Sequence, residues 1–275
     1  MSNIYAEVTK MLAVGPVGLA SDIDGTLSPI ALKPELARIT ERSREALQRL
    51  HSCNSLKVIG IVTGRPALEA RQMVGIDDFV YMGNHGLELL NPKSNQIIFA
   101  KEATSYASVV NTALEQLASE LKALSNTNSD WVENVWVERK GITGSVHYRL
   151  SHNPDMAREN ILALVKNLEH VEDLRVTEGK MVVELRPAVE INKGTALVSL
   201  IESYGLSGLI YIGDDKTDAE GFLAMKRREK QTAFIGKSIG VRSVEMPDII
   251  RETSDVLVDG VSGVEEFLIW MSYNI

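Results

Sequence analysis

The 275-residue sequence contains a single cysteine, Cys53. One thiol cannot form an internal disulfide and cannot by itself build a thiolate metal site. The sequence therefore excludes a disulfide-stapled scaffold and favours a reducing, cytoplasmic location. Cys53 lies beside Asn54 in a polar segment, and we interpret it as incidental rather than nucleophilic.

Long apolar runs are also missing. The longest stretch without Asp, Glu, Lys or Arg has 12 residues, from Ala103 to Leu114, whereas a membrane-spanning helix needs about 20. The apolar stretch from Met11 to Ala20 contains Gly15 and Pro16 and lacks a basic leader and a cleavage site. We expect it to belong to the fold, and we expect no association with membranes.

Basic residues are fewer than acidic ones: the sequence has 29 Lys and Arg and 37 Asp and Glu, so its formal charge is -8. This balance argues against a protein that coats nucleic acid. Hydrophobic residues make up 44% and charged residues 24% of the sequence, which is ordinary globular composition and supplies a substantial core. No obligate protein partner is indicated.

Strand and helix patterns alternate in two separate parts of the chain, which predicts a doubly wound, parallel, Rossmann-like α/β core. In the first part we predict a strand, a helix, a strand and a short helix, at 17–21, about 34–50, 56–63 and after Pro66. In the later part we predict a helix, a strand, a helix, two strands and a closing helix, at 193–204, 209–212, from about 217, 232–235, 256–258 and beyond.

The pattern changes between these two parts. A long helix from about 106 is followed by strands at 131–139 and 145–150, a helix at 154–168 and strands near Leu174 and Met181. Adjacent strands without an intervening helix favour an antiparallel α+β unit. We predict a core formed by residues 1–105 and 187–275, with residues 106–186 inserted as a cap that acts as a lid over the strand ends.

The first candidate site follows the first strand. Asp22 and Asp24 stand two residues apart, and Gly25 lets the chain leave the sheet and turn. Both carboxylates can then face one point. The alternative is an ordinary polar strand end, because Asp and Gly are common turn residues.

Three further strand or helix ends carry polar groups. Asp214, Asp215 and Asp218 crowd together where a strand leads into a helix, a position that suits either a helix cap or a cation such as Mg²⁺. Thr63, Gly64 and Arg65 end another strand, and Lys193 opens a helix. Each of these residues also has an ordinary interpretation: Thr63 as a helix cap, and Arg65 and Lys193 as solvated charges.

Together the four segments resemble the four motifs of the haloacid dehalogenase (HAD) superfamily of phosphotransferases. The resemblance implies that Asp22 is the nucleophile and a Mg²⁺ ligand. It implies that Asp24 is the general acid and base and a second ligand through its carbonyl, and that Asp214 is the third ligand. Thr63 and Lys193 would bind the phosphate and share in catalysis. Asp215 and Asp218 would support this site.

Other segments resemble the trehalose-6-phosphate phosphatase family, from about Leu19 to Phe222. They run from Gly83 to Glu88, 137–140, 146–149, 179–187 and 213–218. The resemblance implies a Mg²⁺-dependent phosphatase of trehalose biosynthesis that works through an aspartyl phosphate. One departure is that the family has Glu directly after the Thr-Asp pair of the last motif, whereas this sequence has Ala219 and then Glu220.

Sugar hydroxyls need alternating donors and acceptors, which charged residues along the predicted cap strands can supply. The alternative is that these charges line a solvated face. The predicted substrate-binding residues are Gly64, Arg65, Asn84, His85, Glu138, Lys140, Arg149, Lys180 and Glu184. Phosphatases of glucosylglycerol, mannosylglycerate or sucrose phosphate, or a sugar-phosphate sensor without turnover, remain alternative functions. The expected partner is a small sugar phosphate.

Overall fold

A computed structural model describes residues 2–53, 55–127 and 129–275 and divides the chain into two compact units. Unit 1 comprises Met1–Ile98 and Ile191–Ile275, and unit 2 comprises Phe99–Glu190. Unit 2 is a few residues longer at each end than the predicted insertion. At its start, a 3-10 segment, Lys101–Tyr106, runs directly into its first helix. In the part of the chain that is described, no helix has the length and apolar content to span a membrane.

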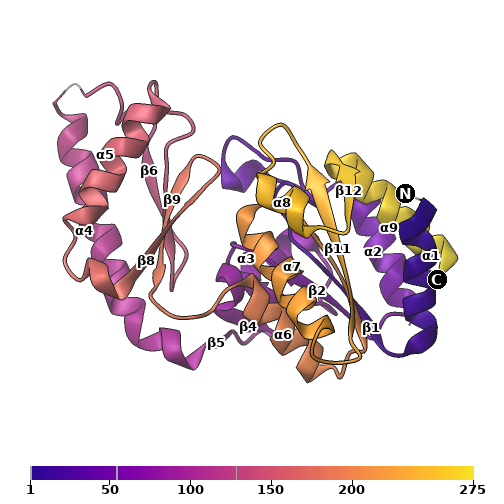
Figure 1. The fold of residues 1–275 in the computed structure, drawn as a ribbon. Coiled ribbons are helices and arrows are strands. Elements are labelled where there is room, and N and C mark those ends of the chain that lie inside the picture. Colours follow the sequence, from indigo (N-terminus) through magenta and orange to yellow (C-terminus); the bar gives the residue numbers. More distant parts are fainter. Residues whose placement is uncertain (1, 54, 128) are drawn as a thin grey trace. The chain divides into compact units, whose positions relative to one another are not determined.

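Unit 1 is built on an eight-stranded sheet in the order β12-β11-β10-β1-β2-β3-β4-β5 (Figure 1). Pairing is parallel from β12 to β3, and β4 runs antiparallel to β3. The strands are β1 Val17–Ser21, β2 Val58–Val62, β3 Val80–Gly83, β4 Glu88–Leu90, β5 Ile98–Phe99, β10 Gly208–Gly213, β11 Ile235–Arg242 and β12 Val256–Asp259. This sheet confirms the predicted parallel α/β core.

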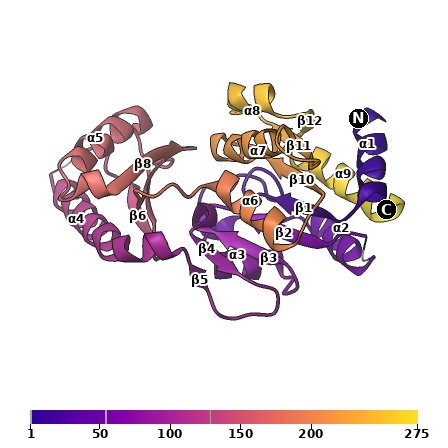
Figure 2. The same ribbon diagram turned by 60° about the horizontal axis from the view of Figure 1, so that its bottom comes forward.

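Helices cover both faces of this sheet (Figure 2). One face carries α1 Ser2–Val14, α2 Glu41–Ser52, α3 Ala67–Val74 and α9 Gly260–Asn274, and the other carries α6 Lys193–Ser203, α7 Lys216–Glu229 and α8 Asp248–Thr253. Successive residues of the central strand serve different cores: Leu19 packs with the first helix group and Ala20 with the second. Both faces being buried explains why β1 and β2 read as continuous apolar runs.

Unit 2 is a four-stranded antiparallel sheet in the order β6-β7-β9-β8 with two helices. The strands are β6 Trp136–Arg139, β7 Gly144–His147, β8 Leu174–Gly179 and β9 Val182–Pro187, and the helices are α4 Ala107–Ser125 and α5 Pro154–Lys166. One face of the sheet packs Val146, Val183 and Leu185 against the helices. The other face is polar.

Several predicted elements need correction. The helix predicted at 34–50 is two elements, a 3-10 turn at Pro34–Leu36 and α2, because the Thr40 side chain accepts a hydrogen bond from the Ser43 amide and caps α2 there. The strand predicted at 232–235 begins only at Ile235. The strand predicted at 131–139 begins at Trp136. Trp131 is buried in the core of unit 2 without being part of a strand.

Candidate active site

The polar segments of unit 1 meet at one edge of its sheet. The chain runs from β1 to β2 on one side, and β10 lies on the other, so the crevice beside β1 and β10 is a topological switch point. Asp22 follows β1 and Asp214 follows β10. The Asp22 amide donates to the carbonyl of Ile212 at 2.9 Å, which places both acids at the carboxyl ends of neighbouring strands.

The turn after Asp22 depends on Gly25. Its φ is +86°, a left-handed conformation, and its amide donates to the Ser28 carbonyl at 2.7 Å. A Cβ at this position would lie 2.1 Å from Oδ2 of Asp214. The turn can therefore approach the Asp214 carboxylate only because residue 25 has no side chain.

Three buried carboxylates share this edge with one buried ammonium. Ligand oxygens of Asp22, Asp214 and Asp218 all lie within 4.8 Å of one another. Lys193 Nζ lies 3.2 Å from Asp22 Oδ1 and 2.7 Å from Asp218 Oδ1. Burial raises the pKa of Asp22, Lys193 opposes that rise, and the neighbouring acids add to it, so the net pKa is raised. Burial lowers the pKa of Lys193, but Asp218 and Asp22 outweigh it and the net pKa is raised.

Asp218 is already saturated with hydrogen-bond donors. Its Oδ1 accepts from Lys193 and from the Tyr211 hydroxyl, and its Oδ2 accepts from the amides of Asp214 and Asp215 at 3.0 and 3.1 Å. Four donors leave this carboxylate little capacity to ligate a cation. Asp218 therefore shapes the loop that presents Asp214, while Asp22 and Asp214 supply the hard oxygen donors that suit Mg²⁺.

Asp24 forms an ion pair with Arg65. The guanidinium donates from Nε to Asp24 Oδ2 at 2.7 Å and from Nη2 to Asp24 Oδ1 at 2.9 Å. It also contacts Glu69 and donates to the Pro34 carbonyl at 3.0 Å. With its side chain only 9% exposed, Arg65 is engaged by the protein itself. These contacts suit orientation of Asp24 better than the predicted direct contact with substrate.

The remaining predicted residues of unit 1 lie in two loops that are hydrogen-bonded to each other. The His85 amide donates to the Thr63 carbonyl at 2.9 Å, and the Asn84 amide donates to the Arg65 carbonyl at 2.8 Å. Thr63, Asn84 and His85 are all buried. The strand ends of β2 and β3 thus bring Thr63, Gly64 and His85 together.

The predicted sugar-binding acids of unit 2 lie in one row across its polar face. Strand register pairs Glu138 with Ser145, Ser145 with Glu184 and Glu184 with Thr177. Lys140 Nζ lies 3.5 Å from a carboxylate oxygen of Glu138 and 3.5 Å from one of Glu184. The row therefore places one ammonium between two carboxylates on a polar surface.

Two residues that were not among the predicted site residues flank this row. His147 Nε2 lies 2.7 Å from Glu138 Oε2 and its ring stacks on Trp136, with centroids 4.8 Å apart. Arg186 Nε lies 3.0 Å from Glu184 Oε2. Burial raises the pKa of Glu138, but His147 and Lys140 outweigh it and hold the pKa below its usual value.

Contrary to prediction, two of the four charged residues are not on strands: Lys140 directly follows the end of β6 at Arg139, and the other is Lys180. It lies in the hairpin turn between β8 and β9, where its carbonyl accepts from Arg149 Nη2 at 2.8 Å. Arg149 thereby supports the turn that carries Lys180. Tyr211, which donates to Asp218, was also missed, because a single tyrosine in a buried apolar strand gives no sign of a polar partner.

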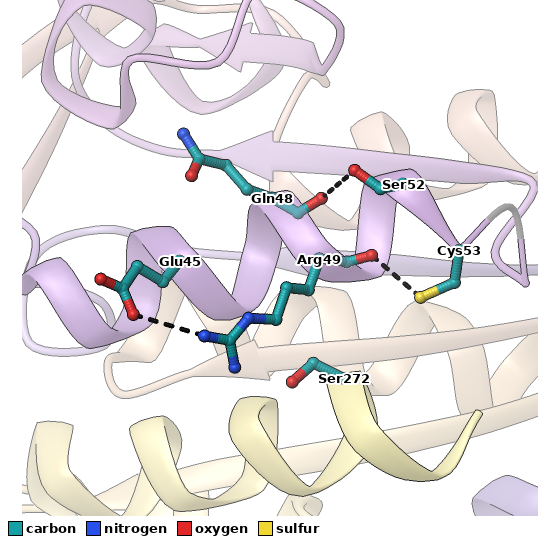
Figure 3. A pocket seen from close by; sticks show the side chains of 6 residues that line it. All are labelled: Glu45, Gln48, Arg49, Ser52, Cys53 and Ser272. Atoms are coloured by element: carbon teal, nitrogen blue, oxygen red, sulfur yellow. Dashed lines mark hydrogen bonds and ion pairs between the residues drawn. The ribbon is translucent and has the colours of Figure 1, made fainter.

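Cys53 lines a shallow hollow between α2 and α9 together with Glu45, Gln48, Arg49, Ser52 and Ser272 (Figure 3). Its thiol donates to the Arg49 carbonyl at 2.9 Å. Because α2 ends here and the chain then enters β2 at its amino end, the hollow lies at the sheet edge opposite the carboxylates. It contains none of the predicted site residues.

Comparison with known proteins gives consistent matches. The trehalose-phosphatase family profile matches residues 20–249. Probable trehalose-phosphate phosphatase 2 of Oryza sativa subsp. japonica is 34% identical over 261 residues, covering 87% of this chain and 65% of the rice protein. Probable trehalose-phosphate phosphatase E of Arabidopsis thaliana is 29% identical, covering 93% of this chain and 72% of its own.

Two further matches concern length and fold. An uncharacterized glycosyl hydrolase of Mycobacterium tuberculosis is 33% identical over 254 residues, but this chain spans only 18% of its length. The C-terminal domain of C. albicans trehalose-6-phosphate phosphatase superposes with a TM-score of 0.78 at 20% identity, covering 99% of this chain and 97% of that one. At that identity the structural match supports the fold alone.

Proposed function

The chain belongs to the trehalose-phosphatase family, and on that premise we propose that it hydrolyses trehalose 6-phosphate to trehalose and inorganic phosphate. The observation that carries the proposal is the buried cluster of Asp22, Asp214 and Lys193 at the switch point of the sheet. A nucleophilic carboxylate, a second acid and a cation held together suit attack on a phosphate dianion.

In the proposed reaction an Asp22 oxygen forms a bond to phosphorus while the bond from phosphorus to the sugar oxygen breaks. Asp24 gives its proton to the departing sugar oxygen. Water then attacks phosphorus and gives a proton to Asp24, and the bond to Asp22 breaks to release phosphate. Arg65 orients the Asp24 carboxylate by its two-point contact, while Thr63 and Lys193 bind the phosphoryl oxygens.

We further propose that Asp22, Asp214 and the Asp24 carbonyl hold Mg²⁺. The fit rests on two buried oxygen donors, on a neighbouring Asp218 whose oxygens already accept four hydrogen bonds, and on the close approach of the Gly25 turn to the Asp214 carboxylate. A bound Mg²⁺ would offset the repulsion between the Asp22 carboxylate and the phosphate.

For the sugar, we propose that the polar row on unit 2 supplies the recognition. In this row Glu138 and Glu184 offer acceptors and Lys140 offers a donor for the hydroxyls of a disaccharide. Lys180, in the turn between β8 and β9, is proposed to offer a further donor. His85 is proposed to bind substrate from unit 1. The proposed partner is this small molecule alone, and the proposed location is cytoplasmic.

The test is phosphate release from a panel of sugar phosphates by the purified chain, with Mg²⁺ and with chelator. We expect turnover of trehalose 6-phosphate well above that of sucrose, glucosylglycerol and mannosylglycerate phosphates, and loss of turnover with chelator. Faster release from one of the others would reassign the substrate. No release from any would contradict the phosphatase function.

Glu184→Gln should separate a disaccharide enzyme from a general phosphatase. The substitution removes the charge that pairs with Lys140 and Arg186. We expect kcat/KM for trehalose 6-phosphate to fall by about 10- to 100-fold, the equivalent of about 1.5–3 kcal/mol for a charged hydrogen bond. For a small aryl phosphate, kcat/KM should stay within about twofold.

The matched control is Glu115→Gln, which alters an exposed carboxylate of the same unit. It should leave both substrates unaffected. An equal loss on both substrates in Glu184→Gln would show that Glu184 supports folding or chemistry rather than sugar recognition.

A further inference from the structure

The turn that carries His85 has an unusual backbone. Asn84, His85 and Gly86 have φ values of +47°, +60° and +100°, so three consecutive residues are left-handed and two of them bear side chains. Such residues cost about 1 kcal/mol or more each and persist where surrounding contacts enforce them. Something must therefore hold this turn.

Glu88 provides that restraint. Its side chain is buried on β4, and both of its oxygens are used: Oε1 accepts from Asn84 Nδ2 at 2.8 Å, and Oε2 accepts from the amide of Ala67 at 2.8 Å. Ala67 is the first residue of α3. One carboxylate thus ties the left-handed turn to the start of the helix that follows Thr63, Gly64 and Arg65.

This turn packs the His85 ring against Gly64, just after the end of β2. A Cβ at Gly64 would lie 2.7 Å from His85 Nε2, so the ring fills the space above that glycine. On the other side, a Cβ at Gly86 would lie 2.8 Å from the Ala196 Cβ on α6. The imidazole therefore packs on Gly64, while Gly86 of the same turn packs against α6, the helix that begins with Lys193.

We propose that Glu88 and Asn84 form a clamp whose function is to position His85 over Gly64, making both of them positioning residues for turnover. This assignment rests on the proposed phosphatase function and adds to it. It also gives Asn84 a different role from the predicted contact with substrate, because its amide points to Glu88.

The test is a swap of hydrogen-bond polarity. Asn84→Asp replaces the amide donor that faces Glu88 with a second acid, and we expect kcat/KM for trehalose 6-phosphate to fall about tenfold. Adding Glu88→Gln restores a donor toward residue 84 and keeps an acceptor for the Ala67 amide. The double variant should recover most of the lost kcat/KM.

The His85→Ala background separates positioning from general stability. If the clamp acts through His85, Asn84→Asp costs no further kcat/KM in that background, although it still lowers the melting temperature. An equal loss of kcat/KM in both backgrounds would overturn the proposal. Gly64→Ala, which displaces the ring without touching the clamp, should reproduce the loss and covers the case in which Asn84→Asp folds poorly.

The imidazole NMR signal of His85 gives a readout independent of turnover. We expect it to shift in Asn84→Asp and to return in the double variant. An unchanged signal in Asn84→Asp would overturn the clamp even if the protein is a phosphatase. A shifted signal in a chain that releases no phosphate would retain the clamp and reject only the proposed function.

Discussion

Asp22→Asn is expected to lower the rate of phosphate release by at least about 10⁴-fold, the scale seen when a catalytic nucleophile is removed. An amide is a poor nucleophile and a poorer ligand for Mg²⁺ than a carboxylate. The measurement is single-turnover phosphate release at saturating Mg²⁺. Asp77→Asn, which alters an exposed carboxylate of the same unit, is the matched control and should keep full activity.

The same substitution should not destabilise the protein. Burial and neighbouring acids raise the pKa of Asp22 in the folded state, so the metal-free protein binds more protons there than the unfolded chain does. The resulting penalty is absent below the ordinary Asp pKa and grows as the pH rises toward the raised value. The melting temperature of metal-free Asp22→Asn should thus equal or exceed that of the wild type at neutral pH. Near wild-type turnover in the folded variant would reject the covalent mechanism.

Lys193→Met is expected to damage both folding and activity. Its ammonium is 2% exposed and pairs with Asp22 and Asp218, so its removal leaves two buried carboxylates uncompensated. We expect the free energy of unfolding to fall by about 3–5 kcal/mol. We expect kcat to fall by about 10²–10³-fold, the loss typical of one electrostatic donor. Urea unfolding and phosphate release measure the two effects.

Two further variants separate these effects. Adding Asp218→Asn to Lys193→Met removes one of the uncompensated charges, so the stability should partly return while kcat stays low. Lys237→Met breaks a pair with Glu7 on the surface of the same unit and should cost at most about 1 kcal/mol. Recovery of kcat together with stability would show that Lys193 acts on folding alone.

The parallel core and the positions of its acids could be predicted from the residue pattern alone. Short apolar runs, each followed by a polar segment, predicted β1, β2 and β10 and put Asp22, Thr63 and Asp214 at their ends. This inference succeeds because parallel strands bring all their carboxyl ends to one edge, whatever their side chains do there. The change of pattern in the middle of the chain similarly indicated the antiparallel unit.

The prediction from hydrophobic spacing failed where a helix-capping residue interrupts the pattern. The helix predicted at 34–50 has apolar residues at helical spacing on both sides of Thr40, yet the Thr40 side chain starts a new helix there. Hydrophobic spacing averages over many residues, whereas a single hydrogen bond decides where a helix begins. The short strands β4 and β5 escaped prediction because two or three residues carry too little pattern.

The partners of the charged groups depend on how distant segments pack together, and the residue pattern does not reveal them. Arg65 was predicted to contact substrate, whereas in the fold it pairs with Asp24. The Glu88 oxygens accept hydrogen bonds from Asn84 and Ala67, which no sequence pattern predicted. The link between His147 and Glu138 likewise follows from the pairing of β6 with β7. Sequence spacing fixes which residues share a strand end or a face, but a hydrogen bond needs a donor and an acceptor atom within about 3 Å. That distance depends on register and rotamers set by the packing of segments far apart in the chain.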